Sequence, residues 1–268
     1  MSVVIDLKIE RQTPSGIHYD VSGRNHAPAL VLLHPLGANR GTWQPQLAEF
    51  ERFFRVIRID MRGHGQSKQS EGPPQPRRIE DLATDALEVL DALGIERAHW
   101  CGVSIGGAIA LQVAVMAPRR VIRLVLANTA ASFPPPNQWD ERVATVQSTG
   151  LAPLLSGIPE RWFTAGYRER EPEEVARIVE LTRETEPRGY IEACMVLRDL
   201  DLRGRLSEVQ SPTLIVGATQ DLSTPVERSE ELMEGISGAD LVVLDAAHLS
   251  NVEQAADFTA VVLDFLRD

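Results

Sequence analysis

The chain has 268 residues, 43% of them hydrophobic, and a formal net charge of -11 at pH 7. This length suffices for one large domain with a buried core. The acidic balance disfavours a nucleic acid partner, because there is no excess of Lys and Arg to contact phosphates. The N-terminal residues lack the pattern of a signal peptide, and no apolar run is long enough to span a membrane. We therefore expect a cytoplasmic protein without a membrane partner.

Apolar, strand-like runs alternate with helical patterns along most of the chain. In chain order, the patterns predict strands at 3–11, 16–22, 29–34 and 54–60, a helix at 79–93, a strand at 98–103, a helix at 105–116 and a strand at 121–128. After an irregular stretch, they predict a strand at 212–218, a helix at 226–236, a strand at 239–244 and a helix at 254–266. This alternation indicates an α/β fold with a mostly parallel central sheet and helices on both faces.

The irregular stretch begins at Ser132. The run Pro134-Pro135-Pro136 is incompatible with a helix interior or a central strand, and the residues that follow have the pattern of several short helices. A structureless loop of this length would be unusual in a compact domain. We therefore predict a sheet core formed by residues 1–131 and 207–268, with a helical cap insertion at 132–206.

The five residues Gly102-Val103-Ser104-Ile105-Gly106 join a predicted strand to a predicted helix. A serine in this context lies on a tight turn, with its hydroxyl exposed at a helix N-terminus beside backbone N–H groups. The pattern predicts that Ser104 is a nucleophile. The cysteines, Cys101 and Cys194, fit no metal or redox spacing, and we expect no metal and no cofactor.

A serine hydroxyl is a weak nucleophile until a histidine removes its proton, and a carboxylate usually orients that histidine. In enzymes with such an elbow, the acid and then the histidine follow the serine in the chain. Asp221 and His248 satisfy this order, and each follows a predicted strand. They are our candidates for the acid and the base.

Other acids and histidines are weaker candidates. His64 precedes the serine, which favours a structural role in a turn, and Asp245 belongs to the same turn as His248. Asn128 ends a predicted strand near the site, but an amide cannot act as the acid. His18 and His26 are expected at the surface.

Two backbone N–H groups are candidates for binding an oxyanion. The first belongs to Ile105, directly after the nucleophile, and the second to Leu36, in the loop that follows the third predicted strand. The alternative is that His34-Pro35 only shapes a turn there. Because the donors would be backbone groups, both interpretations can hold together.

Several stretches resemble known proteins. The His34-Pro35-Leu36-Gly37 loop, the turn at 60–67, the Ser104 elbow and the terminal histidine are similar to those of the α/β-hydrolase superfamily, across essentially the whole chain. The stretches at 126–131, 160–164, 189–194 and 247–254 resemble 3-oxoadipate enol-lactonases of aromatic degradation. The resemblance implies an α/β-hydrolase fold, a Ser104–His248–Asp221 triad and no cofactor. One departure is Ser132, where enol-lactonases often carry a basic residue.

The enol-lactone carries a free carboxylate, so an enzyme acting on it needs a cation near the site. Arg142 and Arg161 are the candidates, although a solvated charge on a helix explains each of them at least as well. Arg142 follows Trp139 by about one helical turn. Trp139 and Trp162 are candidates for an apolar pocket wall, although packing within the insertion explains them equally well. We predict a serine hydrolase that opens a small lactone or ester through an acyl-enzyme, and the resemblance implies that its substrate is the enol-lactone of 3-oxoadipate. The alternatives are a general carboxylesterase, a cofactor-free haloperoxidase or perhydrolase, a carbon–carbon bond hydrolase and a non-catalytic receptor.

Overall fold

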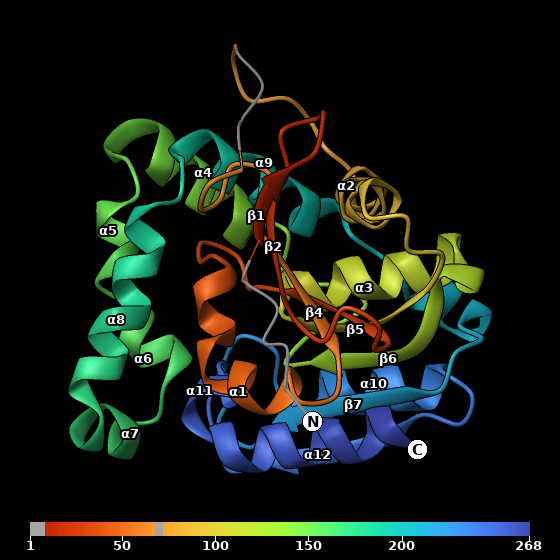
Figure 1. The fold of residues 1–268 in the computed structure, drawn as a ribbon. Helices are drawn as coiled ribbons and strands as arrows, with labels where there is room; N and C mark the ends of the chain where they lie inside the picture. Colours follow the sequence, from red (N-terminus) through yellow and green to blue (C-terminus); the bar gives the residue numbers. More distant parts are fainter. Residues whose placement is uncertain (1–8, 68–71) are drawn as a thin grey trace.

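A central sheet organises the computed structural model, which describes residues 9–67 and 72–268 (Figure 1). Eight strands of the described chain pair in the order β1-β2-β4-β3-β5-β6-β7-β8. Their bounds are β1 Ile9–Gln12, β2 His18–Gly23, β3 Ala29–Leu33, β4 Arg55–Ile59, β5 Ala98–Val103, β6 Val121–Ala127, β7 Thr213–Ala218 and β8 Asp240–Leu244. Strand β2 is antiparallel to β1 and to β4, and every other pairing is parallel. The predicted α/β fold is confirmed. Residues 3–8 of the first predicted strand lie outside the described residues.

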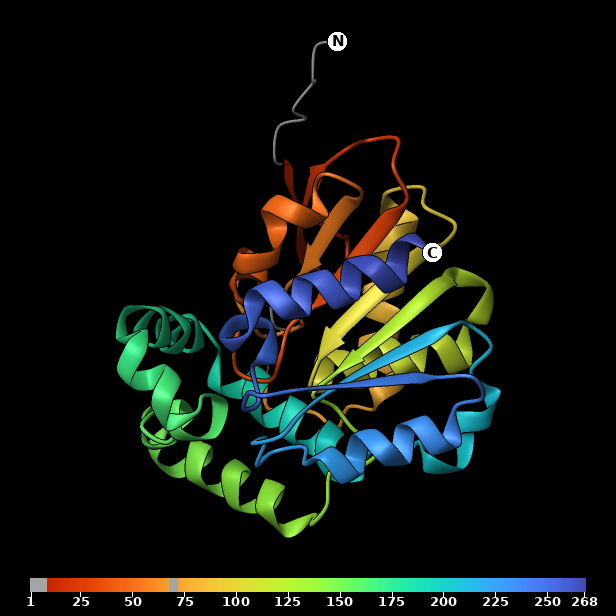
Figure 2. The same cartoon turned by 90° about the horizontal axis from the view of Figure 1, so that it is seen from below.

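Helices cover both faces of the sheet, because neighbouring residues of each inner strand point into different cores. Leu126 and Ile215 pack in the core with α2 (Ile79–Ala92), α3 (Ile105–Met116) and α10 (Val226–Gly235). Val125 and Val216 pack in the other core, with η1 (Arg40–Gln46), α1 (Leu47–Phe50) and α12 (Ala255–Arg267). Figure 2 shows α12 and α10 on opposite sides of the sheet. Because β3 to β8 are parallel, their carboxyl ends lie at one edge of the sheet.

The chain between β6 and β7 is helical. It contains α4 Asn137–Thr149, α5 Ala152–Leu155, α6 Ile158–Trp162, α7 Ala165–Arg170, α8 Pro172–Arg183, α9 Pro187–Asp199 and η3 Arg203–Glu208. We call α4 to α9 the helical insertion. Three of these helices have 12 or 13 residues, so they are longer than the short helices predicted. Helix α4 packs along α9, and α8 contacts η1. Helices α5 to α8 lie on one side of the molecule, beyond the strand ends (Figure 1).

The base of the insertion is joined to the sheet region by backbone contacts. Ser132 and Asp201 form an isolated antiparallel bridge, and the Leu202 N–H donates to the Ala131 carbonyl over 2.8 Å. Helix η3 extends past residue 206 and contacts α3 and α10 of the core. None of the helices in the described residues is long and apolar enough to span a membrane.

His18 corrects one expectation. The sequence pattern predicted it at the surface, but its side chain is only 8% exposed. His18 begins β2, which lies between β1 and β4, and its Nδ1 is 3.7 Å from Asp60 Oδ2. The side chains of Glu10, Arg40 and Asp60 surround its ring and remove this histidine from solvent. His26, in the loop that follows, is exposed as predicted.

Candidate active site

Ser104 occupies a strained turn between β5 and α3. Its backbone has φ 58° and ψ -124°, a conformation that non-glycine residues adopt rarely and at a cost. Two hydrogen bonds hold the turn. The Ser104 N–H donates to the Ala127 carbonyl over 3.0 Å, and the Thr129 hydroxyl donates to the Ser104 carbonyl over 2.6 Å. The strain is therefore imposed by neighbouring structure, as expected where a side chain must be presented in one orientation.

The glycines on each side of Ser104 allow this turn to form. A Cβ atom on Gly102 would lie 2.2 Å from the Gly106 carbonyl oxygen, and one on Gly106 would lie 2.3 Å from the Leu33 carbonyl oxygen. These separations are shorter than any normal contact, and the obstructing atoms belong to the backbone. The predicted elbow is therefore present, and its spacing reflects a direct steric requirement.

Asp221 and His248 form a buried pair. His248 Nδ1 lies 2.8 Å from Asp221 Oδ2 and 3.0 Å from Oδ1, and the two residues are 3% and 4% exposed, respectively. The carboxylate also accepts hydrogen bonds from the Ser223 and Thr224 N–H groups and from the Thr224 hydroxyl. Burial opposes ionisation of Asp221, but His248 and these donors outweigh burial and lower the pKa of the carboxyl. A charged Asp221 can thus orient the His248 ring.

Asn128 belongs to the same cluster, although the sequence indicated only that its amide cannot be the acid. Its side-chain amide donates to Asp221 Oδ2 over 3.0 Å, and its amide oxygen accepts a hydrogen bond from the Ser250 hydroxyl over 2.5 Å. The position directly after β6 was the only sequence signal for this role. Nothing in the sequence indicates which groups surround the amide.

The two backbone N–H groups predicted to bind an oxyanion are available. Leu36 follows β3, and Ile105 is the first residue of α3; neither N–H donates to an acceptor in residues 9–67 or 72–268.

His34 fixes the loop of Leu36. Because the Met61 N–H donates to His34 Nε2 over 2.9 Å, Nδ1 must carry the proton that is shared with the Pro35 carbonyl. Burial lowers the pKa of His34, consistent with this neutral ring.

The rival candidates lie elsewhere. His64 is fully buried, and burial lowers its pKa to about 3. Its Nδ1 contacts the Arg62 carbonyl, and its ring centroid is 5.4 Å from that of His34. Asp245 accepts hydrogen bonds from exposed Thr219 and Gln220. The environment of both residues is that of turn structure.

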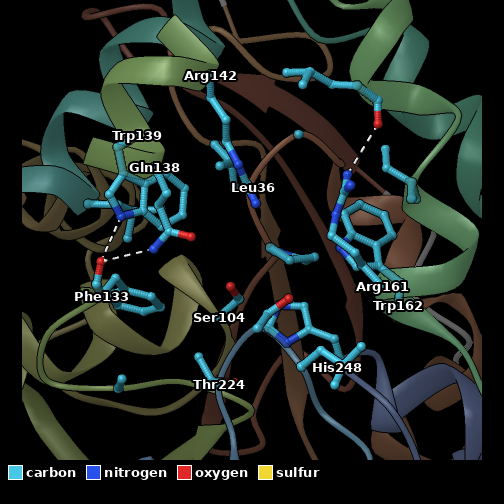
Figure 3. A pocket seen from close by; sticks show the side chains of 18 of the residues that line it. Leu36, Ser104, Phe133, Gln138, Trp139, Arg142, Arg161, Trp162, Thr224 and His248 are labelled. Carbon is cyan, nitrogen blue, oxygen red and sulfur yellow. Dashed lines mark hydrogen bonds between the residues drawn. The ribbon is translucent and has the colours of Figure 1, made fainter. Parts of the chain in front are cut away.

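A cavity of about 440 Å³ opens above Ser104 and His248. Figure 3 shows these two side chains close together at its base, with the helical insertion above them. The cavity is also lined by all four predicted substrate contacts, Trp139, Arg142, Arg161 and Trp162. Its apolar lining includes Leu36, Phe133 and several leucines of the insertion. The structure thus brings the residues from both parts of the chain to one place.

The cavity is positively charged. Arg142 lies with its guanidinium carbon 4.7 Å from the centre of the Trp139 ring, and Arg161 donates to the Leu154 carbonyl over 3.1 Å. Neither arginine forms an ion pair with an acid in the described part of the chain, whereas Arg228, which also lines the cavity, lies 3.4 Å from Glu231. Burial and the nearby charge of Arg142 lower the pKa of Arg161. No Asp or Glu of the described residues lines the cavity.

Ser132 lines the same cavity and is 6% exposed. Its hydroxyl has no hydrogen-bond partner in the described chain. Ser132, where enol-lactonases often carry a basic residue, therefore lies at the cavity wall, and any cation in the cavity must come from another position.

The described residues contain no cluster of three or more His, Cys, Asp or Glu side chains that could hold a metal ion.

Comparisons with known proteins agree with this geometry. A family model described as alpha/beta hydrolase fold matches residues 28–255. The chain belongs to the alpha/beta hydrolase family. It is 33% identical over 267 residues to 3-oxoadipate enol-lactonase 1 of Acinetobacter baylyi, covering 100% of this chain and 99% of that protein. It is 31% identical over 260 residues to the putative carbamate hydrolase RutD of Agrobacterium fabrum, covering 93% and 98%.

A solved structure is similar over nearly the whole chain. The enol-lactonase from Burkholderia xenovorans LB400 matches with a TM-score of 0.92 and 38% identity, covering 97% of this chain and 100% of that one. The resemblance to the α/β-hydrolase superfamily and to its enol-lactonases is thus confirmed, and this family member is a hydrolase.

Proposed function

We propose that the protein hydrolyses the enol-lactone of 3-oxoadipate, with Ser104 as nucleophile, His248 as base and Asp221 as orienting acid. The observation that carries this proposal is the cavity itself: Ser104 and His248 share it with two arginines that form no ion pair with an acid of residues 9–67 or 72–268. A small anionic ester is the substrate class that such a cavity favours. The similarity to enol-lactonases names a member of that class.

Acylation begins when His248 removes the hydroxyl proton of Ser104 as the oxygen attacks the lactone carbonyl. The new negative charge on the carbonyl oxygen is stabilised by the Leu36 and Ile105 N–H groups, which have no other acceptor in the described chain. Asp221 stabilises the imidazolium that forms. Collapse of the intermediate breaks the ring bond, and His248 returns the proton to the enol oxygen.

Deacylation uses the same groups. Because the broken bond was part of a ring, the enol end remains attached to the acyl group on Ser104. His248 then takes a proton from water, and the hydroxide attacks the ester carbonyl, releasing the acid and restoring the serine hydroxyl. The free acid is a dicarboxylate after the enol becomes a ketone.

We propose that Arg142 and Arg161 bind the carboxylate of the substrate. Two guanidinium groups held near each other raise the free energy of the empty cavity, and an anion between them relieves that repulsion. The overall charge of -11 repels anions at long range, so local cations are required. Trp139 stacks beneath Arg142 and holds it at the wall.

A substrate panel tests this proposal. We expect kcat/KM for the enol-lactone of 3-oxoadipate to exceed that for simple neutral lactones, p-nitrophenyl esters and a small carbamate by roughly tenfold or more, the effect of one hydrogen-bonded charge. A preference for the neutral ester would favour a general carboxylesterase. A preference for the carbamate would favour the activity named for the RutD relatives.

The remaining alternatives are separated by simpler measurements. Covalent labelling of Ser104 by a fluorophosphonate distinguishes an enzyme from a ligand receptor on the same fold. Halide oxidation in the presence of a peroxide would identify a haloperoxidase or perhydrolase. Cleavage of a carbon–carbon bond in a diketone substrate would identify a carbon–carbon bond hydrolase. We expect labelling, and neither of the other two reactions at a comparable rate.

A further inference from the structure

Asn128 is fixed at the end of β6 in an unusual backbone conformation. Its φ is 44°, a region that non-glycine residues rarely enter, and its side chain is fully buried. The Asn128 N–H donates to the Val216 carbonyl of β7 over 2.8 Å. The residue is therefore held between two neighbouring strands, directly beside the loop that carries Asp221.

The side-chain amide contacts Asp221 itself and two residues that lie near His248 in the chain. Its nitrogen donates to Asp221 Oδ2 over 3.0 Å and approaches the Ala247 carbonyl at 3.4 Å. Its oxygen accepts a hydrogen bond from the Ser250 hydroxyl over 2.5 Å. One amide therefore joins the carboxylate of Asp221 to residues 247 and 250, which lie on either side of His248 in the chain.

We propose that Asn128 is a positioning residue, which holds the carboxylate of Asp221 and the loop of His248 in fixed relation. This inference rests on the proposed function of the Ser104 site. An amide suits the position because it donates at one end and accepts at the other. A carboxylate could not donate to Asp221, and an apolar side chain would leave Asp221 and Ser250 each without one partner.

The charged surroundings of the pair define the expected sign of a pH effect. His248 contacts Asp221 directly, Arg228 on α10 lines the cavity, and Glu253 on α11 (Ser250–Glu253) accepts the Ala247 N–H over 3.0 Å. Losing the Asn128 donor leaves more negative charge on Asp221 for the imidazolium of His248. Asp221 should then hold the protonated ring of His248 more strongly, and an ionised carboxylate at position 128 should add to this attraction.

The test is the pH dependence of fluorophosphonate labelling of Ser104, which needs no knowledge of the natural substrate. Asn128→Ala and Asn128→Asp should label roughly tenfold more slowly than the wild type at neutral pH, the effect of losing a hydrogen bond to a charged group. The acid-side midpoint of the profile should move to higher pH in both, by roughly one pH unit or more in Asn128→Asp.

Val252→Ala is the matched control. Val252 is 3% exposed on the same helix as Ser250, so its truncation loosens packing near the site without removing a hydrogen bond to Asp221. Its midpoint should stay at the wild-type value. Should Asn128→Ala fail to fold, Asn128→Asp, which has nearly the same shape, carries the test, and thermal melting verifies its fold.

The outcomes separate this inference from the proposed function. Variants at position 128 that label at the wild-type rate with an unmoved midpoint would overturn the positioning role, while leaving the hydrolase proposal intact. A wild-type protein that labels strongly but does not open the enol-lactone would overturn the proposed substrate alone. In that case, a raised midpoint in the Asn128 variants would still support the inference.

Discussion

The loops at the sheet edge and the helices of the insertion line one cavity, but they hold their side chains in different ways. Asp221 accepts hydrogen bonds from three neighbouring residues besides His248. Ser104 is held by Ala127, the last residue of β6, and by Thr129 just after it. Arg142 instead has the Trp139 ring face and the Tyr190 hydroxyl as partners, and Arg161 has one carbonyl. Their charges have no acidic partner in the described chain.

This difference matches the two separate tasks that we propose for these residues. Groups that transfer protons must be positioned within a few tenths of an ångström, which requires several short hydrogen bonds to backbone. Groups that select an anion need charge more than exact placement, and an arginine already paired with an acid would have little attraction left for a ligand. The comparison predicts that changes at the sheet edge affect kcat, whereas changes in the insertion affect KM and substrate choice.

The largest expected effect is at the sheet edge. Ser104→Ala and His248→Ala should each lower kcat by roughly 10⁴-fold or more, and Asp221→Asn should lower it somewhat less, because the triad acts as a unit. KM should change little. Steady-state kinetics on any accepted ester measure this, and a Ser104→Ala protein that keeps more than about a tenth of wild-type turnover would refute the nucleophile assignment.

The next effect is expected in the insertion. Arg142→Ala and Arg161→Ala should each raise KM for the enol-lactone by roughly tenfold, and leave a neutral p-nitrophenyl ester nearly unchanged. Arg168→Ala is the matched control, because Arg168 also belongs to the insertion but lies 4.0 Å from Glu160 and does not line the cavity. Equal changes for charged and neutral substrates would mean that the two arginines have structural roles.

The same division explains how much the sequence could predict. The Ser104 elbow depends on five consecutive residues and their flanking strand and helix, so a local pattern suffices. Asp221 and His248 could be placed because the ends of parallel strands share an edge. The burial of His18 and the contacts of Asn128 depend on strand order and on side chains more than 90 positions away. No local pattern encodes them.

The insertion shows a second limit. Its helical character and the shared location of Arg142 and Trp139 followed from composition and helical spacing. Whether an arginine is free or paired depends on which acids come near it after folding. Arg142 and Arg228 each lie in a helix that also contains acidic residues, but of the two only Arg228 forms an ion pair with a carboxylate of its own helix.

Trp139 provides a smaller test of the insertion. Its indole N–H donates to the Phe133 carbonyl over 2.7 Å, and its ring supports Arg142. Trp139→Ala should therefore raise KM for the enol-lactone by roughly threefold, the weight of one cation–π contact. It should also lower the melting temperature, because a buried ring is lost.

Trp162→Ala separates specificity from packing in the same assay. Trp162 lines the cavity, and no arginine of the described residues stacks on its ring, so its loss should change KM for charged and neutral esters alike. If both tryptophan variants lower only the melting temperature, the pocket wall lies elsewhere and the two rings serve packing.

The smallest expected effect concerns stability of the core. Gln112 lies in α3, is fully buried, and neither its amide nitrogen nor its oxygen has a partner in the described chain. Replacing it with Met keeps a straight side chain and removes two unpaired polar atoms, so Gln112→Met should raise the free energy of unfolding by about 1 kcal/mol. Urea titration measures this free energy.

Gln138→Met is the counterpart in the insertion. Gln138 is partly exposed and donates to the Pro134 carbonyl over 3.0 Å, so the free energy of unfolding should change by no more than about 0.5 kcal/mol in this variant. A loss of stability in Gln112→Met would instead show that the buried amide is hydrogen-bonded in solution, and that α3 is held by polar contacts as the sheet-edge loops are.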